Sequence, residues 1–284
     1  MNIPPRIAIL EEYVKKEGGK LFSSLESKNC IVFCKETGRE FVRKAKIIAL
    51  AEAMYRLKSP YALEIFGIQE KNEKAYLLME RILQGSLEQL IKSGKNQYNY
   101  ISEEKIWDIA AQISITLNHF HMNSIYHKGL RPCSIYLSSA GFAKLDEFVV
   151  LQKANSMDVS SPYSGSIAAY QCPELINGQR CTNKADMFSF GAILFEIGEQ
   201  HLPFESTTIE DLNEKILTAK HRPFERITSP RLQKLITQLL HKLPKKRPSA
   251  SDLLQWPEIK SSAERMKQQA AKKFEEDSEI EEQI

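Results

Sequence analysis

The sequence predicts an α+β fold in which short strands come first and long helices follow. Residues 30–34 (CIVFC) and 41–44 (FVRK) are stretches of strand length, and the turn sequence between them contains Gly38. Two more strand-like stretches lie within residues 61–82. From residue 102 onward, apolar residues recur at the spacing of an α-helix. We therefore expect a small strand-rich part and a larger helical part.

Length and composition indicate a globular protein. The chain has 284 residues, of which 42% are hydrophobic, so it can bury a sizeable core as one large domain or two small lobes. No apolar run reaches the roughly 18 residues that a membrane-spanning helix needs. The N-terminus places acidic residues and lysines directly after a short apolar patch, unlike a secretory signal. We expect an intracellular protein located in the cytoplasm.

Cysteine content and charge exclude several further classes. The five cysteines are odd in number and lack paired C-x-x-C spacing, which argues against a disulfide framework and a structural zinc site. The net charge of +3 is too small to indicate nucleic-acid binding. The last ten residues carry six acidic and no basic residues, so residues 1–274 hold 39 basic against 30 acidic ones. A mildly basic body with an acidic tail follows.

The strand-rich part contains one lysine of interest. Because side chains alternate along a strand, Val42 and Lys44 are expected to share one face. Residues 45–57 then repeat apolar residues at helical spacing, which predicts a helix packed against the strands. Glu52 is the one acidic residue of this segment, and Leu50 takes its place if the segment is aligned backwards from Ser59 and Pro60. An ion pair of Lys44 with Glu52 is therefore an open alternative.

The helical part has clear start signals. Ser86 is expected to cap one helix, and Ser102, followed by Glu103 and Glu104, is expected to cap the next. The second helix leads to a short basic loop at residues 127–132. Residues 184–191 open a strongly apolar helix, and residues 258–284 are expected to form a charged helix or tail.

Residues 125–149 (IYHKGLRPCSIYLSSAGFAKLDEFV) resemble the catalytic and metal-binding loops of the protein kinases, where the pattern is H-R-D-L-x-x-x-N followed by D-F-G. Residues 127–130 read His-Lys-Gly-Leu, and Ser134 and Glu147 occupy the Asn and metal-binding Asp positions. Further kinase landmarks follow in order across residues 28–257. The chain resembles a degenerate member, or pseudokinase, of the Ser/Thr and tyrosine-kinase-like kinases.

The resemblance implies a bilobal kinase fold, mainly β in the N-lobe and mainly α in the C-lobe. The boundaries that it implies are a lead-in at residues 1–17, an N-lobe at 18–82, a C-lobe at 83–257 and the charged segment at 258–284.

The resemblance also implies an ATP pocket. Lys44 would pair with the phosphates, and Val42 would lie over the adenine. Met79 would guard the back of the pocket, and the backbone at Glu80 and Ile82 would meet the base. The glycine-rich loop is not matched, because residues 24–29 read SLESKN. Since glycines let the backbone approach phosphates, we expect ATP binding, with or without Mg²⁺, to be weakened or lost.

No catalytic position of the pattern is intact. Gly129 replaces the catalytic Asp and can accept no proton, while Ser134 offers a hydroxyl in place of an amide oxygen. Glu147 keeps a carboxylate on a longer arm and could still hold one Mg²⁺. Asp146 is its substitute if the register slips by one residue. Val149 replaces the glycine of D-F-G.

Four structural positions of the family are kept. His127 stays within the catalytic-type loop, and Asp186 would hold the backbone of that loop. Glu174 and Arg247 would form a buried ion pair.

These substitutions predict a regulatory or scaffolding module that binds a protein partner, such as an active kinase or signalling protein. One alternative is an atypical active Ser/Thr kinase that uses Glu147 or Asp146 for metal. The other is a nucleotide-gated switch without catalysis. No nucleic acid and no membrane span are expected.

Overall fold

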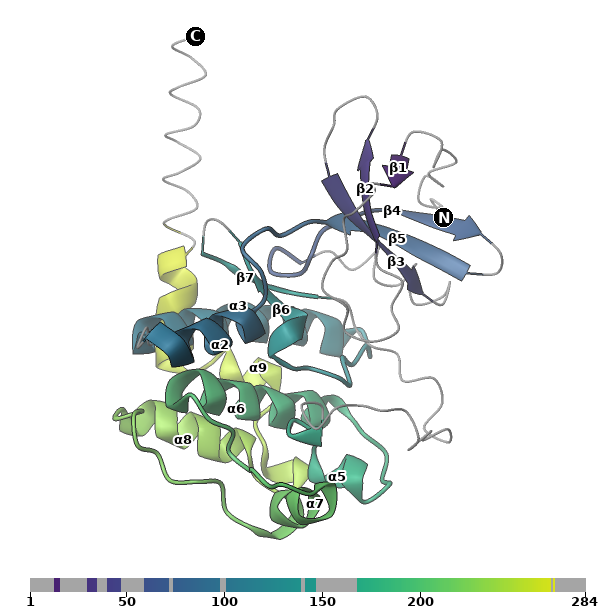
Figure 1. The fold of residues 1–284 in the computed structure, drawn as a ribbon. Coiled ribbons are helices and arrows are strands. Elements are labelled where there is room, and N and C mark those ends of the chain that lie inside the picture. Colours follow the sequence, from purple (N-terminus) through teal and green to yellow (C-terminus); the bar gives the residue numbers. More distant parts are fainter. Residues whose placement is uncertain are drawn as a thin grey trace.

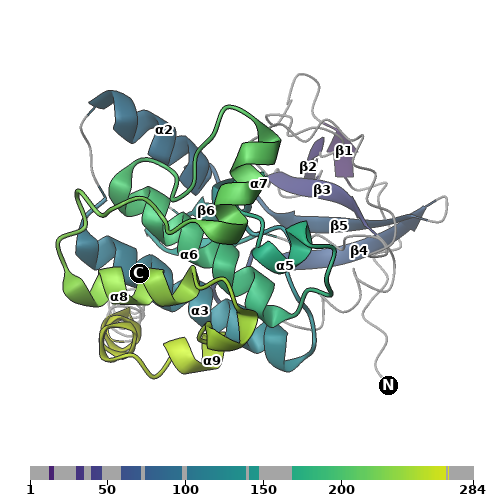
Figure 2. The same cartoon turned by 90° about the horizontal axis from the view of Figure 1, so that it is seen from below.

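The computed structural model describes residues 13–15, 30–34, 40–46, 59–71, 74–97, 101–138, 141–146, 168–266 and 268. A sheet lies at one end of the molecule and a larger helical body at the other (Figure 1). Figure 2 shows the same two parts from below, with the helices gathered beside the sheet. The predicted α+β order, with strands first and helices after them, is confirmed.

Five antiparallel strands form the first sheet. They are β1 (Tyr13–Lys15), β2 (Cys30–Cys34), β3 (Glu40–Lys46), β4 (Ile65–Lys71) and β5 (Lys74–Glu80), in the spatial order β1-β2-β3-β5-β4. The predicted strand stretches at 30–34 and 41–44 pair directly, with Ile31 opposite Val42. Central strand β3 then pairs with β5, so that Val42 lies opposite Met79. The predicted helix at residues 45–57, with Glu52, lies outside the described residues.

A second, two-stranded sheet joins the two parts. It consists of β6 (Ile135–Leu137) and β7 (Ala143–Leu145). The backbone N–H of Leu63 donates to the carbonyl of Leu145 at 2.9 Å, and the N–H of Leu145 donates to the carbonyl of Tyr61 at 2.8 Å. The chain leading into β4 therefore runs beside β7, which ties the sheet to the helical body.

The helical body contains α2 (Leu87–Gln97), α3 (Glu103–Met122), α5 (Pro173–Ile176), α6 (Asn183–Glu199), α7 (Ile209–Thr218), α8 (Pro230–Leu239) and α9 (Ala250–Leu253), with the short 3₁₀ turns η2 (Pro132–Ser134) and η3 (Pro244–Lys246). Ser102 caps α3 as predicted, because its hydroxyl accepts from the N–H of Lys105 at 3.3 Å. At α2 the bond runs the other way: the Ser86 N–H donates to Oε1 of Gln89 at 2.9 Å.

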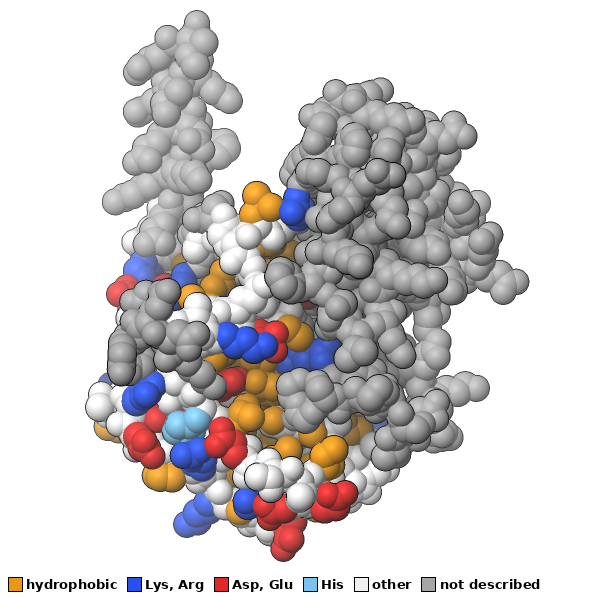
Figure 3. Space-filling model, viewed as in Figure 1, with side chains coloured by type: hydrophobic (Ala, Val, Ile, Leu, Met, Phe, Trp, Pro, Cys, Tyr) orange, Lys and Arg blue, Asp and Glu red, His pale blue; other side chains and the backbone are white. Residues whose placement is uncertain are grey.

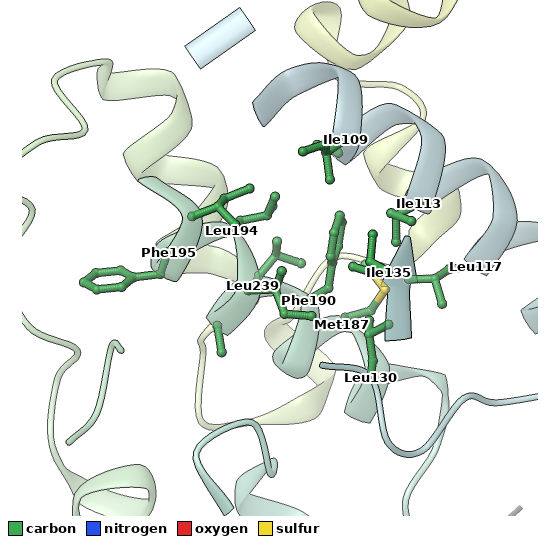
Figure 4. Close-up of a cluster of buried hydrophobic side chains, with 14 of the residues drawn as sticks. Ile109, Ile113, Leu117, Leu130, Ile135, Met187, Phe190, Leu194, Phe195 and Leu239 are labelled. Carbon is green, nitrogen blue, oxygen red and sulfur yellow. The ribbon is translucent and has the colours of Figure 1, made fainter. Parts of the chain in front are cut away.

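Helix α6 is the centre of the core. Most of its residues are buried, including Phe188, Phe190 and Phe195. Figure 4 shows side chains of α6 meeting those of α3 and α8 around Phe190. A Cβ at Gly191 would lie 2.6 Å from Cβ of Leu239, so glycine is what lets α6 and α8 approach so closely.

The first part of the charged C-terminal segment packs onto α3. Residues 257–266 are helical, and Ile259 and Met266 are buried. Nη1 of Arg265 lies 3.2 Å from the Glu104 carboxylate, and Nη2 of Arg265 also contacts Asp108. This stretch is therefore held by both apolar and charged contacts with α3.

The surface of the described part carries both signs of charge. On the face shown in Figure 3, acidic and basic side chains lie beside and below a hydrophobic area. Within the described ranges, none of the helices has both the length and the apolar character needed to cross a membrane.

Candidate functional site

The basic loop after α3 is held by a carboxylate from α6. Oδ1 of Asp186 accepts from the backbone N–H of Lys128 at 2.7 Å, and Oδ2 accepts from the N–H of His127 at 2.8 Å. Nε2 of His121, on the last turn of α3, lies 2.8 Å from the same Oδ2. His127 is fully buried and Asp186 nearly so. Hydrogen bonds to a buried carboxylate are charge-assisted and strong, so the loop is firmly placed.

The loop conformation at Lys128 is unusual. Lys128 is exposed and has φ +59°, in the left-handed region that non-glycine residues rarely adopt. Such a residue costs of order 1–3 kcal/mol and persists only where its surroundings enforce it. The bond from its N–H to Asp186 is one such constraint.

Gly129 follows directly and contributes no side chain. The described glycines with positive φ are Gly85, Gly141 and Gly178, and Gly129 is not among them. The backbone there consequently lies in a region that other residues also adopt. A glycine is not required by the local conformation.

The hydroxyl of Ser134 turns back onto its own 3₁₀ turn. Its Oγ donates to the carbonyl of Arg131 at 2.7 Å and accepts from the N–H of Arg131 at 3.1 Å. Ser134 is also buried. The two bonds use the proton and one of the two lone pairs of the hydroxyl and orient it toward Arg131.

The start of the metal-binding-type loop lies against Ser134. The backbone N–H of Asp146 donates to the carbonyl of Ser134 at 2.7 Å. Asp146 is buried directly after β7. Glu147 and Val149 lie outside the described residues, so the assignment of Glu147 to a metal stays a prediction. The described residues include no group of three His, Cys, Asp or Glu side chains that could hold a metal ion.

The residues predicted to line an ATP pocket lie on β3, β5 and the chain after it. Val42 and Lys44 lie opposite Met79 and Leu77 in the β3–β5 pairing, and Met79 is buried. The side chains of Val42 and Lys44 are outside the described part. Ile82 is half-buried and packs against the core.

Glu80 is engaged on both its backbone and its side chain. Its N–H donates to the carbonyl of Glu64 at 2.8 Å. Its carboxylate accepts from Nζ of Lys144 on β7, at 2.8 Å and 2.6 Å to the two oxygens. This ion pair joins the end of β5 to the second sheet.

Glu174 and Arg247 form a bidentate pair deep in the helical body. Nη1 and Nη2 of Arg247 each donate to a Glu174 oxygen at 2.7 Å, and both side chains are buried. The guanidinium also donates to the carbonyls of His241, Lys242 and Lys184. The pair fastens α5 to the chain before α9.

Two contacts of the site were not predicted from the sequence. His121 joins Asp186 from 65 positions away, and Lys144 joins Glu80 from 64 positions away. A histidine at a helix end and a lysine on a short strand carry no local signal of such partners. The structure therefore adds two charged contacts, His121 with Asp186 and Lys144 with Glu80, to the residues that the motifs identify.

Comparison with known proteins places this arrangement in a family. A family model described as the protein kinase domain matches residues 17–258. The serine/threonine-protein kinase Nek5 of Mus musculus is 32% identical over 237 residues, which cover 82% of this chain and 36% of that protein. The serine/threonine-protein kinase Nek2 of Homo sapiens is 26% identical over 229 residues, covering 76% of this chain and 50% of that protein.

A third relative, the probable serine/threonine-protein kinase nek2 of Dictyostelium discoideum, is 26% identical over 251 residues, or 87% of this chain and 58% of that protein. The chain thus spans less than two thirds of the length of each of these relatives. The family match covers most of the chain, and the fold has the strand-rich and helical parts of a two-lobed α+β kinase domain. The chain belongs to the protein kinase domain family.

Proposed function

We propose that this kinase domain is impaired in phosphoryl transfer and acts as a regulatory or scaffolding module that binds a protein partner, such as an active kinase or signalling protein. The observation that carries the proposal is the loop held by Asp186. Its backbone is fixed at His127 and Lys128, and the next residue is a glycine. The frame for a catalytic base is kept while the base is absent from it.

The chemistry explains why this absence matters. In phosphoryl transfer an Asp of the catalytic loop accepts the proton of the substrate hydroxyl, and a second Asp with an Asn holds Mg²⁺ on the phosphates. Loss of a positioned base costs a factor of roughly 10² to 10⁴. Gly129 has no proton-accepting side chain. Asp186, the carboxylate that holds this loop, already accepts from two N–H groups and contacts His121.

The metal-binding positions support the same proposal. The hydroxyl of Ser134 is oriented by its two bonds to Arg131 within η2, and it offers a single neutral oxygen where the family has an amide. ATP, with or without Mg²⁺, would meet Lys44, Val42, Met79, Glu80 and Ile82 if it binds. Residues 24–29 lack the glycines that would let the backbone approach its phosphates. We infer that nucleotide binding is weak.

A partly exposed hydrophobic surface at α5 supports a protein partner. Leu175 and Ile176 of α5 are half-buried hydrophobic residues. Figure 3 shows a hydrophobic area on the helical body with acidic and basic side chains beside it. Exposed apolar areas with a polar rim are typical of protein-binding surfaces. The partner would be met inside the cell, in the cytoplasm.

The relatives favour a second candidate function. All three bear the name of serine/threonine-protein kinases. In that case this chain would be an atypical active kinase in which Glu147 or Asp146 binds the metal and another group accepts the proton.

A transfer assay separates the two functions. The full chain is incubated with γ-labelled ATP, Mg²⁺ and a general Ser/Thr substrate protein, and Lys44→Met serves as the matched control. We expect labelling no higher than that of Lys44→Met. Labelling that depends on Lys44 would overturn the proposal and establish the active enzyme.

A nucleotide titration tests the third alternative, a nucleotide-gated switch. Ligand at a hundred times its dissociation constant stabilises a protein by about 2.7 kcal/mol. We expect no rise in melting temperature with millimolar ATP, with or without Mg²⁺. A saturable rise in the absence of phosphoryl transfer would indicate the switch instead.

A further inference from the structure

A helical segment after α9 lies along α3, and we call this segment, residues 257–266, the strap. From residue 259 onward it lies beyond the range that matches the family. Ile259, Ser262 and Met266 of the strap are buried. Because these positions are three and four residues apart, they share one face of the helix. The strap therefore has a buried face of its own.

One stripe of α3 receives the strap. Glu104, Asp108 and Gln112 are spaced four residues apart, so they lie one above the other along that helix. Nη1 of Arg265 lies 3.2 Å from the Glu104 carboxylate. Nη2 of Arg265 contacts Asp108 and lies 3.3 Å from Oγ of Ser262. A single guanidinium of the strap thus meets two carboxylates of α3.

Gln112 lies at the end of this stripe and is 1% exposed. Its Oε1 accepts from the backbone N–H of Ala143 on β7 at 2.5 Å, and its Nε2 donates to Sδ of Met266 at 2.7 Å. A backbone N–H can only donate, so the amide must turn its oxygen toward β7 and its NH₂ group toward the strap. One side-chain amide therefore joins the strap to β7.

Strand β7 leads directly into the metal-binding-type loop. Ala143 is the first residue of β7, and Asp146 is the residue after its end. The N–H of Asp146 donates to the carbonyl of Ser134 at 2.7 Å. The position of β7 consequently affects where the Asp146 carboxylate lies.

We propose that the strap positions β7, and with it Asp146, through the amide of Gln112, so that release of the strap from α3 loosens the start of the metal-binding-type loop. Gln112 is a positioning residue in this arrangement, because it acts through Ala143. A protein partner that drew the strap away from α3 would change this loop without touching it. The inference does not depend on whether the domain transfers phosphate.

The ion pairs are the part of the contact that can be changed without disturbing the core. The side chain of Arg265 is 35% exposed, and those of Glu104 and Asp108 are 69% and 19% exposed. Met266, by contrast, is buried in the hydrophobic core. Loss of partly exposed ion pairs destabilises a fold only weakly, whereas like charges placed together repel. A reversed charge at Arg265 is therefore the change that should release the strap while the domain stays folded.

Hydrogen exchange of single amides, measured by NMR on the full chain, tests the proposal. Arg265→Asp sets a third carboxylate beside Glu104 and Asp108. We expect the amides of the strap, of Ala143 and of Asp146 to exchange faster than in the wild type. At Ala143 the increase should be roughly threefold to tenfold, which corresponds to the loss of one hydrogen bond. The amides of α7 should keep their exchange rates.

A charge reversal elsewhere serves as the matched control. Arg222 pairs with Glu205, and the side chains of these two residues are 41% and 45% exposed. Arg222→Asp should therefore break an ion pair at the surface without affecting the strap. The exchange rate of Ala143 should be the same in this variant as in the wild type.

Two further variants separate positioning from a general loss of stability. Asp108→Arg combined with Arg265→Asp again places opposite charges together, so the exchange rate of Ala143 should return toward that of the wild type. Gln112→Leu removes the link, so Ala143 should exchange faster, and adding Arg265→Asp should accelerate it no further. Circular dichroism checks the fold of each variant. If Gln112→Leu does not fold, Arg265→Asp and the charge exchange with Asp108 still decide.

Three results would overturn the proposal. In the first, Arg265→Asp accelerates exchange in the strap while Ala143 and Asp146 keep their rates, so β7 is placed without the strap. In the second, the strap stays protected in Arg265→Asp, so these ion pairs do not hold it. In the third, the amides of α7 accelerate as much as Ala143 does, so the effect is a loss of global stability.

Discussion

Oδ1 of Asp186 lies 2.7 Å from the backbone nitrogen of Lys128, which belongs to a loop 58 positions earlier in the chain. The same carboxylate holds His127, so one side chain of α6 fixes two consecutive residues. The geometry of the loop is therefore set by a residue that takes no part in proton transfer. This separation lets the loop keep its shape with a glycine at position 129.

Asp186→Asn should destabilise the fold by about 2–3 kcal/mol. An amide oxygen can still accept one N–H, but the charge that strengthens these bonds is removed, and bonds to charged groups contribute roughly 1.5–3 kcal/mol. Urea unfolding followed by circular dichroism measures the change. Asp211→Asn is the control, because Asp211 is an exposed residue of α7, and its replacement should change the free energy of unfolding far less. Equal effects of the two variants would contradict the role given to Asp186.

Glu174→Gln should destabilise the fold more than Asp186→Asn does, by about 3–5 kcal/mol, because it leaves the buried guanidinium of Arg247 without its counter-charge. The exposed pair of Glu88 and Lys92 on α2 offers the comparison, since their atoms are also close, at 3.2 Å. Glu88→Gln should change the free energy of unfolding by only about 0.3–0.5 kcal/mol. If the two variants change the free energy of unfolding by similar amounts, the pair of Glu174 and Arg247 contributes less to stability than its buried geometry indicates.

The order of strands and helices could be predicted because local patterns carry it. The pairing of residues 30–34 with 41–44 follows from two strand-like stretches and a glycine turn, and the cap at Ser102 follows from the residue types around it. Asp186, Glu174 and Arg247 were identified as site residues through the motif frame. None of these predictions required knowledge of distant contacts.

The contacts that complete the site depend on tertiary packing. Nothing near His121 or Lys144 in the sequence indicates Asp186 or Glu80 as a partner. The use of the Ser134 hydroxyl within η2 is likewise a matter of geometry that residue type does not specify. The docking of residues 257–266 on α3 depends on Ile259 and Met266 meeting a face that only the folded helix presents.

Lys242 should make the stability of the protein depend on pH. Its Nζ donates to the carbonyl of Ile216 and lies 4.0 Å from the centroid of the Phe204 ring. Burial, with a contribution from nearby Arg247, lowers the pKa of Lys242 from 10.5 to about 8. Between these two values the unfolded chain binds more protons than the folded one. The contribution of Lys242 to stability should therefore rise as the pH increases from 8 to 10.5.

The difference between wild type and Lys242→Met isolates this contribution from other titrating groups. Urea unfolding at several pH values measures the free energy of unfolding of both proteins. The value for the wild type should increase relative to that of Lys242→Met above pH 8, and the difference between the two should be constant below that pH. Lys245→Met is the control, because Lys245 is exposed in the same segment, and its difference from wild type should stay flat. If the difference in unfolding free energy from wild type rises with pH equally for both variants, the burial of Lys242 is not the cause of the pH dependence.

Restoring the missing groups should restore transfer if the frame is otherwise sound. The triple variant Gly129→Asp, Ser134→Asn, Glu147→Asp supplies a base and two metal ligands in a loop that Asp186 already holds. Gly129 is not among the described residues with positive φ, so an aspartate fits its backbone conformation. Because a positioned base contributes roughly 10² to 10⁴ in rate, labelling should rise at least tenfold above wild type at the same ATP concentration. Gly129→Asp alone should give less labelling than the triple variant, since the hydroxyl of Ser134 remains bonded to Arg131.

Adding Lys44→Met to the triple variant should remove the increase in labelling. If the triple variant binds ATP yet transfers nothing, the defect lies outside these three positions.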